Sequence, residues 1–211
     1  MPRLPDPPLL VITDRTQARG DLADVAAAAC AGGCRWLSLR EKDLAPEAQI
    51  ALFARLRDAT RPFGAILTLH GPAGLARAAG ADGVHLPDGA DARAARALLG
   101  SDALVGLSIH AVADAARVVA ADVDYITASP VFLTASKPGY GPALGPQGLA
   151  AFVAAVPVPV IALGGVDATT AALCRQAGAA GLAVMGPVMR AEDPAAQLAG
   201  LVAAWNTVQQ G

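Results

Sequence analysis

Short apolar runs recur along the whole chain, and each of them ends in a polar or glycine-bearing turn. Such runs, rich in valine, leucine and isoleucine, are typical of buried parallel strands. We expect strands at Leu9–Asp14, Trp36–Glu41, Ala65–His70, Gly83–Leu86, Ala103–His110, Asp124–Val131, Val158–Gly165 and Gly181–Gly186. Helical spacing of apolar residues predicts helices between them, at Asp21–Ala31, Pro46–Arg61, Ala92–Leu99, Ala111–Val119, Pro146–Ala155 and Thr169–Ala177, with a closing helix at Pro194–Val208. This alternation indicates consecutive βα units.

A turn of small residues precedes every even-numbered strand of this series. The turns are Ala31–Cys34, Ala79–Asp82, Ala120–Val123 and Ala177–Ala180. Each follows a helix end and leads into a buried strand, so the same helix–turn–strand pattern recurs once in every two βα units. Eight strands with this recurrence predict an α/β fold, a (β/α)8 TIM barrel that forms one domain over residues 1–211. An open doubly wound sheet is the alternative, although it usually has fewer strands and no such recurrence.

Composition excludes several classes of function. The chain has 211 residues, of which 54% are hydrophobic, and a formal net charge of −2, which argues against a general nucleic-acid binder. No apolar run reaches the length of a membrane span, and the proline-rich start, Met1–Pro8, contains an acid, unlike a signal peptide. Three cysteines, Cys30, Cys34 and Cys174, form no disulfide pattern and are expected to be buried thiols. We therefore expect a reduced, cytoplasmic protein without a nucleic-acid or membrane partner.

The last two expected strands end in bare backbone, at Gly164–Gly165 and at Gly186. Exposed N–H groups at such turns, followed by a helix N-terminus, form a cradle for phosphate. In a (β/α)8 barrel, the loops after the seventh and eighth strands are the usual phosphate site. The expected partner is therefore a phosphorylated small-molecule substrate.

Two cations mark the end of the second expected strand. Arg40 and Lys42 alternate along it and so share a face, whereas Glu41 points the other way. Paired cations at the mouth of a barrel suit an anion such as a diphosphate. A solvated strand end is the alternative interpretation.

The segment after the sixth expected strand, Thr134–Gly141, is long for a βα turn and rich in hydroxyls and glycine. Thr134, Ser136 and Lys137 fit an oxyanion lid that closes over substrate, and an ordinary surface loop is the alternative. The fifth strand delivers Ser108 to the same rim.

All three histidines fall near expected strand ends. His85 lies one residue before the end of its strand, so we expect it to pack inside the barrel as a structural residue. His70 and His110 project at the rim and are the better candidates for proton transfer.

These motifs, taken in order along nearly the whole chain, resemble the thiamine phosphate synthase and thiazole tautomerase superfamily. The resemblance is carried by Val11–Arg15, Leu39–Lys42, Ala81–Leu86, Ser108–His110, Ser129–Phe132, Thr134–Lys137, Ala162–Gly165 and Ala183–Gly186. It implies that Arg40, Lys42 and Lys137 hold diphosphate, that Thr134 and Ser136 supply hydroxyls of a clamp loop, and that Gly164, Gly165 and Gly186 hold a thiazole phosphate. In the synthase the thiazole nitrogen displaces diphosphate from a pyrimidinylmethyl carbon, with help from magnesium and the cations.

The chain departs from the synthase pattern at its metal-binding acids. Where the synthase carries Asn-Asp after the third strand, this chain has His70-Gly71-Pro72, and the second acid aligns near Ala90. Asp88 and Asp91 lie close by but out of register. Magnesium prefers hard oxygen ligands, so we predict no metal site from these residues.

Two further positions separate the branches of the superfamily. Ser38 replaces the glutamine that the synthase carries before Arg40, and Pro130 occupies the place of the tautomerase histidine after the sixth strand. The tautomerase moves a proton without a metal, and His70 could supply that transfer here. The catalytic candidates are His70, His110 and Lys137, with Ser108 among the substrate-binding residues.

Three hypotheses remain open from the sequence. The first, which the missing metal-binding acids favour over the other two, is a metal-independent thiazole tautomerase-like enzyme that needs no cofactor. The second is a thiamine phosphate synthase with an altered metal site, in which case Mg²⁺ is required. The third is a non-catalytic binder of thiazole phosphate or thiamine phosphate. By analogy with other barrels of this kind, we expect a homodimer.

Overall fold

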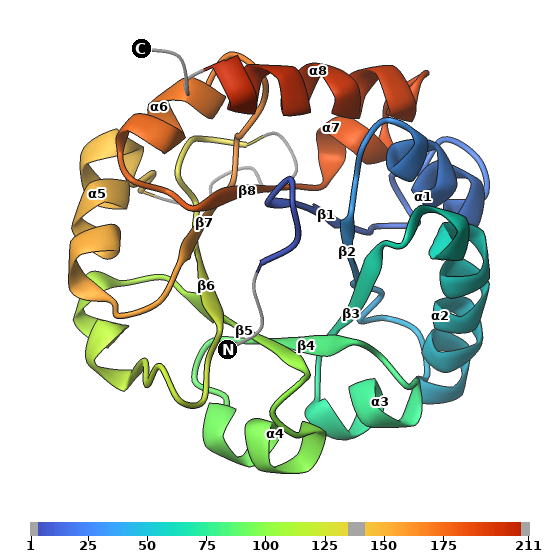
Figure 1. The fold of residues 1–211 in the computed structure, drawn as a ribbon, viewed down its shortest axis with the longest axis horizontal. Helices are drawn as coiled ribbons and strands as arrows, with labels where there is room; N and C mark the ends of the chain where they lie inside the picture. Colours follow the sequence, from blue (N-terminus) through green and yellow to red (C-terminus); the bar gives the residue numbers. More distant parts are fainter. Residues whose placement is uncertain (1–3, 135–141, 208–211) are drawn as a thin grey trace.

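The computed structural model describes residues 4–134 and 142–207. Within them, eight parallel strands close into a barrel in chain order, and β8 returns to pair with β1 (Figure 1). The strands are β1 (Leu9–Ile12), β2 (Trp36–Leu39), β3 (Ile66–His70), β4 (Gly83–Leu86), β5 (Leu104–Ile109), β6 (Tyr125–Ala128), β7 (Val160–Leu163) and β8 (Gly181–Val184). This closure confirms the predicted (β/α)8 barrel and rules out an open sheet.

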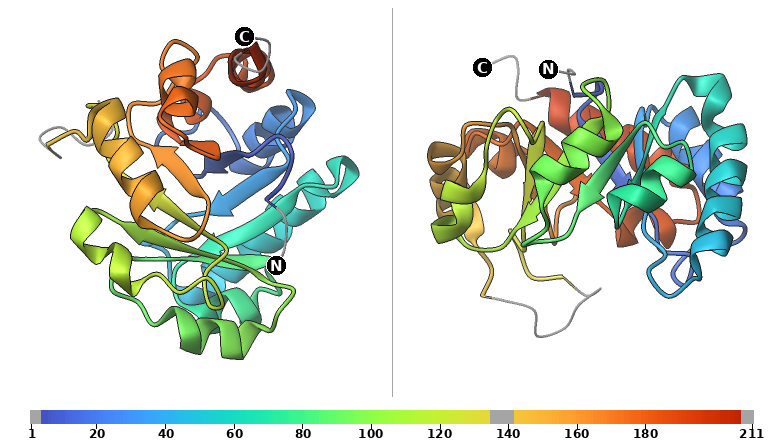
Figure 2. Two further views of the ribbon diagram at one scale, coloured as in Figure 1. Left: turned by 60° about the vertical axis from the view of Figure 1, so that its left-hand side comes forward. Right: turned by 90° about the horizontal axis from the view of Figure 1, so that it is seen from below.

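A ring of helices surrounds the barrel, as Figure 2 shows from two further sides. The helices are α1 (Leu22–Ala31), α2 (Pro46–Thr60), α3 (Ala73–Ala78), α4 (Ala92–Leu99), α5 (Gly145–Ala155), α6 (Ala171–Gln176), α7 (Gly186–Met189) and α8 (Pro194–Thr207). Two segments are 3₁₀ helices, η1 (Arg61–Phe63) and η2 (Val112–Arg117). Helix α8 packs against both α1 and α6 and so closes the ring.

Local sequence accounts for several helix starts. The carboxylate of Asp21 accepts a hydrogen bond from the Ala23 N–H at 2.9 Å, and Asp91 does the same for Ala94 at 2.9 Å. These caps satisfy backbone donors that have no partner inside the helix. Helix α2 begins with Pro46, whose fixed φ suits the first helical position.

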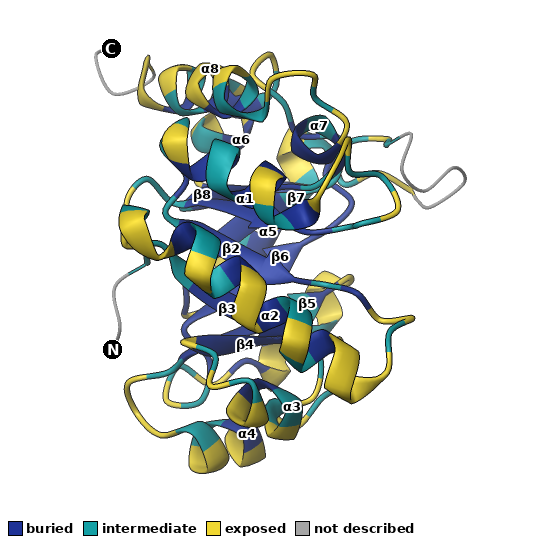
Figure 3. Ribbon diagram, turned by 90° about the vertical axis from the view of Figure 1, so that its right-hand side faces the viewer, coloured by how far each residue is buried: buried dark blue, intermediate teal, exposed yellow. Residues whose placement is uncertain are grey.

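The strands separate two hydrophobic cores. The larger core lies between the barrel and its helices, whose outer faces are exposed while the strands are buried (Figure 3). The smaller core fills the barrel interior and consists of Leu10, Ile12, Trp36, Leu104, Tyr125, Ile161 and Ala183. The rings of Trp36 and Tyr125 meet edge to face at 4.7 Å between centroids. Because both faces are packed, the strands are mostly apolar, which explains the apolar runs in the sequence, and the polar residues Ser38, Thr68 and Thr127 within them are buried as well.

The predicted small-residue turns are confirmed before all four even strands, and three of them contain a glycine with positive φ. Gly33, Gly80 and Gly178 have φ values of 106°, 61° and 90°, a range that L-amino acids rarely adopt and that glycine adopts readily. Each turn reverses the chain from a helix end into β2, β4 or β8. The turn before β6 has no glycine and no residue with positive φ.

Other segments differ from the sequence prediction. The expected helix at Ala111–Val119 is a shorter 3₁₀ helix, since Asp114 N–H donates to Ala111 O and Val118 N–H to Ala115 O, both three residues back at 3.0 Å. Helices α3 and α7 are short and lack the length that a periodicity argument needs. The polar residues predicted at strand ends, such as Asp14 and His110, lie just beyond the strands.

The three cysteines are buried thiols, as predicted. No helix in the described part of the chain combines the length and the apolar character that a membrane crossing requires.

Candidate active site

A cavity of about 370 Å³ opens at the carboxyl ends of the strands, and all eight strands or the loops that follow them contribute to its wall. This is the edge at which enzymes of this fold carry their active sites. The predicted site residues that line it are Arg40, Lys42, His70, Ser108, His110, Thr134, Gly164, Gly165 and Gly186. Ser136 and Lys137 lie outside the described residues. The structure therefore gathers nine of the predicted residues, whose roles stay predictions.

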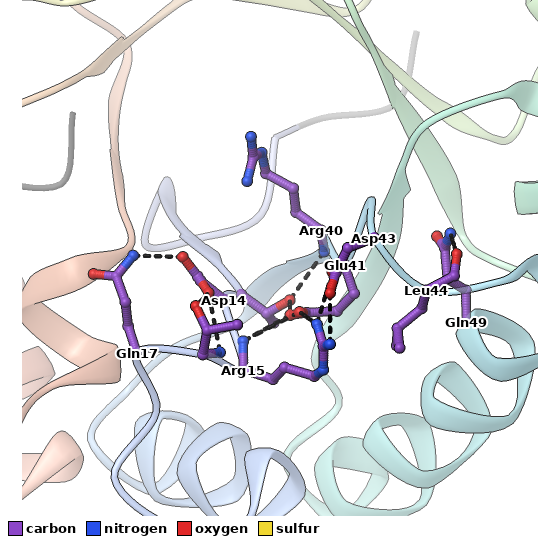
Figure 4. A network of polar contacts seen from close by, with 10 residues as sticks. Asp14, Arg15, Gln17, Arg40, Glu41, Asp43, Leu44 and Gln49 are labelled. Atoms are coloured by element: carbon purple, nitrogen blue, oxygen red, sulfur yellow. Dashed lines mark hydrogen bonds and ion pairs between the residues drawn. The ribbon is translucent and has the colours of Figure 1, made fainter.

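Arg40 and Lys42 reach this cavity while Glu41 turns away from it, as their alternation predicts. Figure 4 shows the Arg40 side chain extending away from Glu41. Glu41 is only 2% exposed, and it accepts hydrogen bonds from Thr13 Oγ1 at 2.7 Å and from the Arg15 N–H at 3.0 Å. The Arg15 guanidinium adds an ion pair to Glu41 at 3.2 Å. The carboxylate therefore ties the end of β1 to the loop after β2.

This network also fixes the backbone that carries Arg40. The Arg40 N–H donates to Thr13 Oγ1 at 2.9 Å, and the Thr13 hydroxyl in turn donates to Glu41. Thr13 and Glu41 are both buried. Two buried side chains thus set the direction in which Arg40 leaves the strand.

The glycine-bearing side of the cavity lies against the loop after β6. Gly164 O accepts a hydrogen bond from the Phe132 N–H at 2.9 Å, and Leu163 O accepts one from Val131 N–H at 2.9 Å. Gly165 has a φ of 62°, and a Cβ at this position would lie 2.5 Å from Leu133 O. Glycine here satisfies both an unusual conformation and a close backbone approach.

His85 packs inside the barrel, as predicted. Its ring is 1% exposed and hydrogen-bonds Tyr125 Oη at 3.0 Å and Ser108 Oγ at 2.9 Å. Burial, helped by the nearby Lys42 charge, lowers the pKa of His85 to about 3, so the ring is neutral near pH 7. Burial raises the pKa of the Tyr125 phenol, with a smaller effect of Asp124 in the same direction. His85 therefore orients Ser108 at the floor of the cavity rather than transferring protons.

Acidification is expected to destabilise the fold through His85. The pKa of His85 is about 6.5 in the unfolded chain and about 3 in the folded protein. Between these two pH values the unfolded chain binds a proton that the native ring does not, so the free energy of unfolding decreases as the pH is lowered. From pH 7 to pH 5 we expect a loss of about 2 kcal/mol in unfolding free energy. Denaturant titrations of the wild type and of His85→Gln measure it, and equal pH slopes for the two would contradict the assignment.

The two rim histidines occupy different surroundings. His110 lies 3.1 Å from Ser129 O through Nδ1, and a carbonyl can only accept, so Nδ1 carries the proton in that contact. In the neutral ring, this tautomer makes Nε2 the basic nitrogen. His70 is buried, lines the cavity, and its ring centroid is 4.9 Å from that of His85.

The two carboxylates that lie close in sequence to the expected metal-binding positions, Asp88 and Asp91, both make contacts with protein groups. Asp88 pairs with Arg117 at 2.9 Å, and the Asp91 carboxylate caps α4. Among residues 4–134 and 142–207, no three histidine, cysteine or acidic side chains come together as a metal site. The donor set therefore does not fit magnesium held by protein carboxylates.

Small residues replace the expected acids and leave space. A second cavity of about 650 Å³ adjoins the first and shares Lys42, His70 and Pro87 with it. Gly71 and Ala90, the positions that align with the metal-binding acids, both line this space. Where the resembled synthase carries carboxylates, the chain has an open and largely apolar wall.

Arg190 is a cavity residue that the sequence interpretation missed. It follows α7 directly and lies four residues after Gly186. Four residues correspond to about one helical turn, which brings its side chain back over that glycine. A helix start at Gly186 was the signal that could have found it.

Comparison with known proteins identifies the family. The family model described as thiamine monophosphate synthase matches residues 9–188. The chain belongs to the thiamine monophosphate synthase family. A protein from Geobacter sulfurreducens, provisionally named a thiamine-phosphate synthase, is 43% identical over 197 residues, which cover 92% of each chain. A thiamine-phosphate synthase from Methanoregula boonei is 38% identical over 188 residues, covering 88% of this chain and 87% of its own.

A solved structure agrees with this family assignment. The thiamine phosphate pyrophosphorylase from Pyrococcus furiosus is 27% identical, has a TM-score of 0.83 and overlaps 96% of each chain. The predicted resemblance is thus confirmed, and the chain belongs to a family of enzymes. These names favour the synthase hypothesis over the tautomerase one, which was the first choice from the sequence.

Proposed function

We propose that this protein is a thiamine phosphate synthase, which joins a pyrimidinylmethyl diphosphate to a thiazole phosphate and releases diphosphate. One observation carries the proposal: a single cavity has two cations, Arg40 and Lys42, on its wall together with the glycine-bearing ends of β7 and β8. A reaction between a diphosphate and a phosphate monoester needs two anion sites around one reacting centre. The names of the relatives support the same reaction.

The chemistry follows from where charge develops. The thiazole nitrogen forms a bond to the pyrimidinylmethyl carbon while the bond from that carbon to the diphosphate oxygen breaks and its electron pair leaves with diphosphate. Arg40 and Lys42 stabilise the negative charge that grows on the leaving group, Arg40 by its fixed pair of N–H donors and Lys42 as a point charge. No proton is transferred in this step, so the synthase reaction needs neither His70 nor His110 as a base.

The two anions are held at different places in the cavity. The thiazole phosphate lies against Gly164, Gly165 and Gly186, where the lack of side chains lets backbone N–H groups approach the phosphate oxygens. Diphosphate lies at Arg40 and Lys42. The cavity wall between them includes Ser108 and His110, which position the pyrimidine.

Incubating the purified protein with both substrates tests this proposal, in parallel with magnesium and with a chelator. Thiamine phosphate formed in either arm is the expected result. Because the described acids do not form a metal site, we also expect no saturable magnesium binding to the protein without diphosphate.

The other outcomes separate the remaining hypotheses. No thiamine phosphate in both arms, from protein whose circular dichroism shows it folded, would overturn the proposal. Aromatisation of a carboxythiazole phosphate without metal, lost in His70→Ala, would instead establish the tautomerase. Binding of thiazole phosphate with neither reaction would identify a non-catalytic binder.

A further inference from the structure

Arg190 lies against the backbone of the glycine at the start of α7. A Cβ placed on Gly186 would be 2.7 Å from Arg190 Cζ, so a side chain there would displace the guanidinium from its position. Gly186 is not among the glycines with positive φ, so its conformation alone does not require glycine. Glycine at this position leaves open the space that the guanidinium occupies.

Two polar side chains from the loop after β1 hold this guanidinium. Arg190 donates a hydrogen bond to Gln17 Oε1, and Gln17 Nε2 donates to the Asp14 carboxylate (the second contact is drawn in Figure 4). The Gln17 backbone N–H also donates to Asp14 O at 3.1 Å. Since Asp14 takes the amide nitrogen, the amide oxygen must face the arginine.

The network preserves positive charge at the cavity. Gln17 is neutral, so its hydrogen bond positions Arg190 without cancelling its charge. Burial alone would raise the pKa of Asp14, but hydrogen bonds from Thr16 and Gln17, with the Arg40 charge, outweigh it and lower that pKa. Asp14 therefore stays ionised near neutral pH and keeps the amide oriented.

We propose that Arg190 binds the phosphate of the thiazole substrate and selects the phosphorylated thiazole over the free alcohol, with Gln17 as its positioning residue. The inference rests on the proposed function for the identity of that substrate. The planar guanidinium of Arg190 presents paired N–H donors that match two phosphate oxygens. Arg190 lines the same cavity as Gly164 and Gly165. The backbone alone supplies partial charges there, whereas Arg190 supplies a full one.

Steady-state kinetics of Arg190→Gln and Arg190→Lys test the assignment. For Arg190→Gln we expect a KM for thiazole phosphate about ten- to thirtyfold higher, an unchanged KM for the pyrimidine diphosphate, and unchanged kcat/KM for the unphosphorylated thiazole alcohol. Arg190→Lys keeps the charge without the fork and should fall between. Gln17→Ala should raise the same KM about threefold, because the arginine remains but loses its support.

Arg19→Gln is the matched control. Arg19 pairs with Glu192 at 2.8 Å on the surface and is absent from the cavity wall, so its loss should leave both KM values unchanged. Equal losses for phosphorylated and unphosphorylated thiazole in Arg190→Gln would overturn the proposal, because they indicate a structural role.

A direct binding measurement separates this inference from the proposed function. If the wild type forms no thiamine phosphate, calorimetric titration with thiazole phosphate still compares it with Arg190→Gln. Affinity at least tenfold weaker in the variant supports the arginine site although the synthase proposal has failed. Equal affinities, or no binding by the wild type, would overturn the arginine site.

Discussion

Replacing Glu41 with alanine is expected to lower the free energy of unfolding by about 3 kcal/mol. Glu41 is 2% exposed and accepts hydrogen bonds from Thr13 and Arg15, which the substitution leaves without their acceptor. Removing one partner of a buried pair usually costs about 3–5 kcal/mol. Because the Arg15 side chain is 34% exposed, solvent screens part of its lost attraction, and we expect the lower end of that range.

Asp43→Asn is the matched control, since Asp43 binds the same arginine at 2.6 Å but is 61% exposed. An exposed ion pair contributes at most about 1 kcal/mol, so the control should unfold nearly as the wild type does. Chemical denaturation of the two variants measures the difference. Equal free energies of unfolding for Glu41→Ala and Asp43→Asn would show that the hydrogen bonds of Glu41 do not stabilise this part of the barrel rim.

The Glu41 variant also tests how Arg40 is positioned. Without Glu41, the Thr13 hydroxyl has no acceptor there and is free to rotate away from its bond with the Arg40 N–H. We expect a KM for the pyrimidine diphosphate about tenfold higher and a KM for the thiazole phosphate that changes less than twofold. A change in the thiazole phosphate KM alone would contradict the link between Glu41 and Arg40.

The barrel and the cationic side of its site, with Arg40 and Lys42, could be predicted from the sequence because both depend on local periodicity. Strands packed on both faces are mostly apolar, so they appear as apolar runs, and alternation alone places Arg40 and Lys42 on one side with Glu41 on the other. The same alternation indicated nothing about what Glu41 binds. Its partners Thr13 and Arg15 come from the segment that follows β1, and only the pairing of β1 with β2 brings them close to Glu41.

The place of Arg190 in the site could not be predicted from local periodicity. Its partner Gln17 is 173 residues away along the chain, and the two meet only because β8 pairs with β1. A similar limit applied to η2, because apolar spacing over nine residues does not distinguish a 3₁₀ helix from an α-helix. The absence of acidic residues at Gly71 and Ala90, by contrast, is visible in the sequence itself. The cavity that Gly71 and Ala90 line could not be predicted from it.

Replacing Gly165 with alanine is expected to damage both the fold and the phosphate site. Its φ of 62° is strained for alanine, and the added Cβ would lie 2.5 Å from Leu133 O and 2.7 Å from Phe132 Cβ. Strain in this conformation costs about 1–2 kcal/mol, and overpacking against the loop after β6 adds about 1–3 kcal/mol. We therefore expect an unfolding free energy lower by about 2–5 kcal/mol.

Gly64→Ala separates the two causes, because Gly64 has a φ of 63° and no atom within 4 Å of an added Cβ. It should lose only the strain, about 1–2 kcal/mol. The excess loss in Gly165→Ala then measures how closely the loop after β6 packs on the end of β7. Because relief of that contact must move Leu133 and its neighbour Thr134, which both line the cavity, we also expect weaker binding of thiazole phosphate in Gly165→Ala alone. Equal destabilisation by the two variants would mean that glycine serves the backbone conformation only, and that the bare end of β7 is not shaped by its contact with the loop.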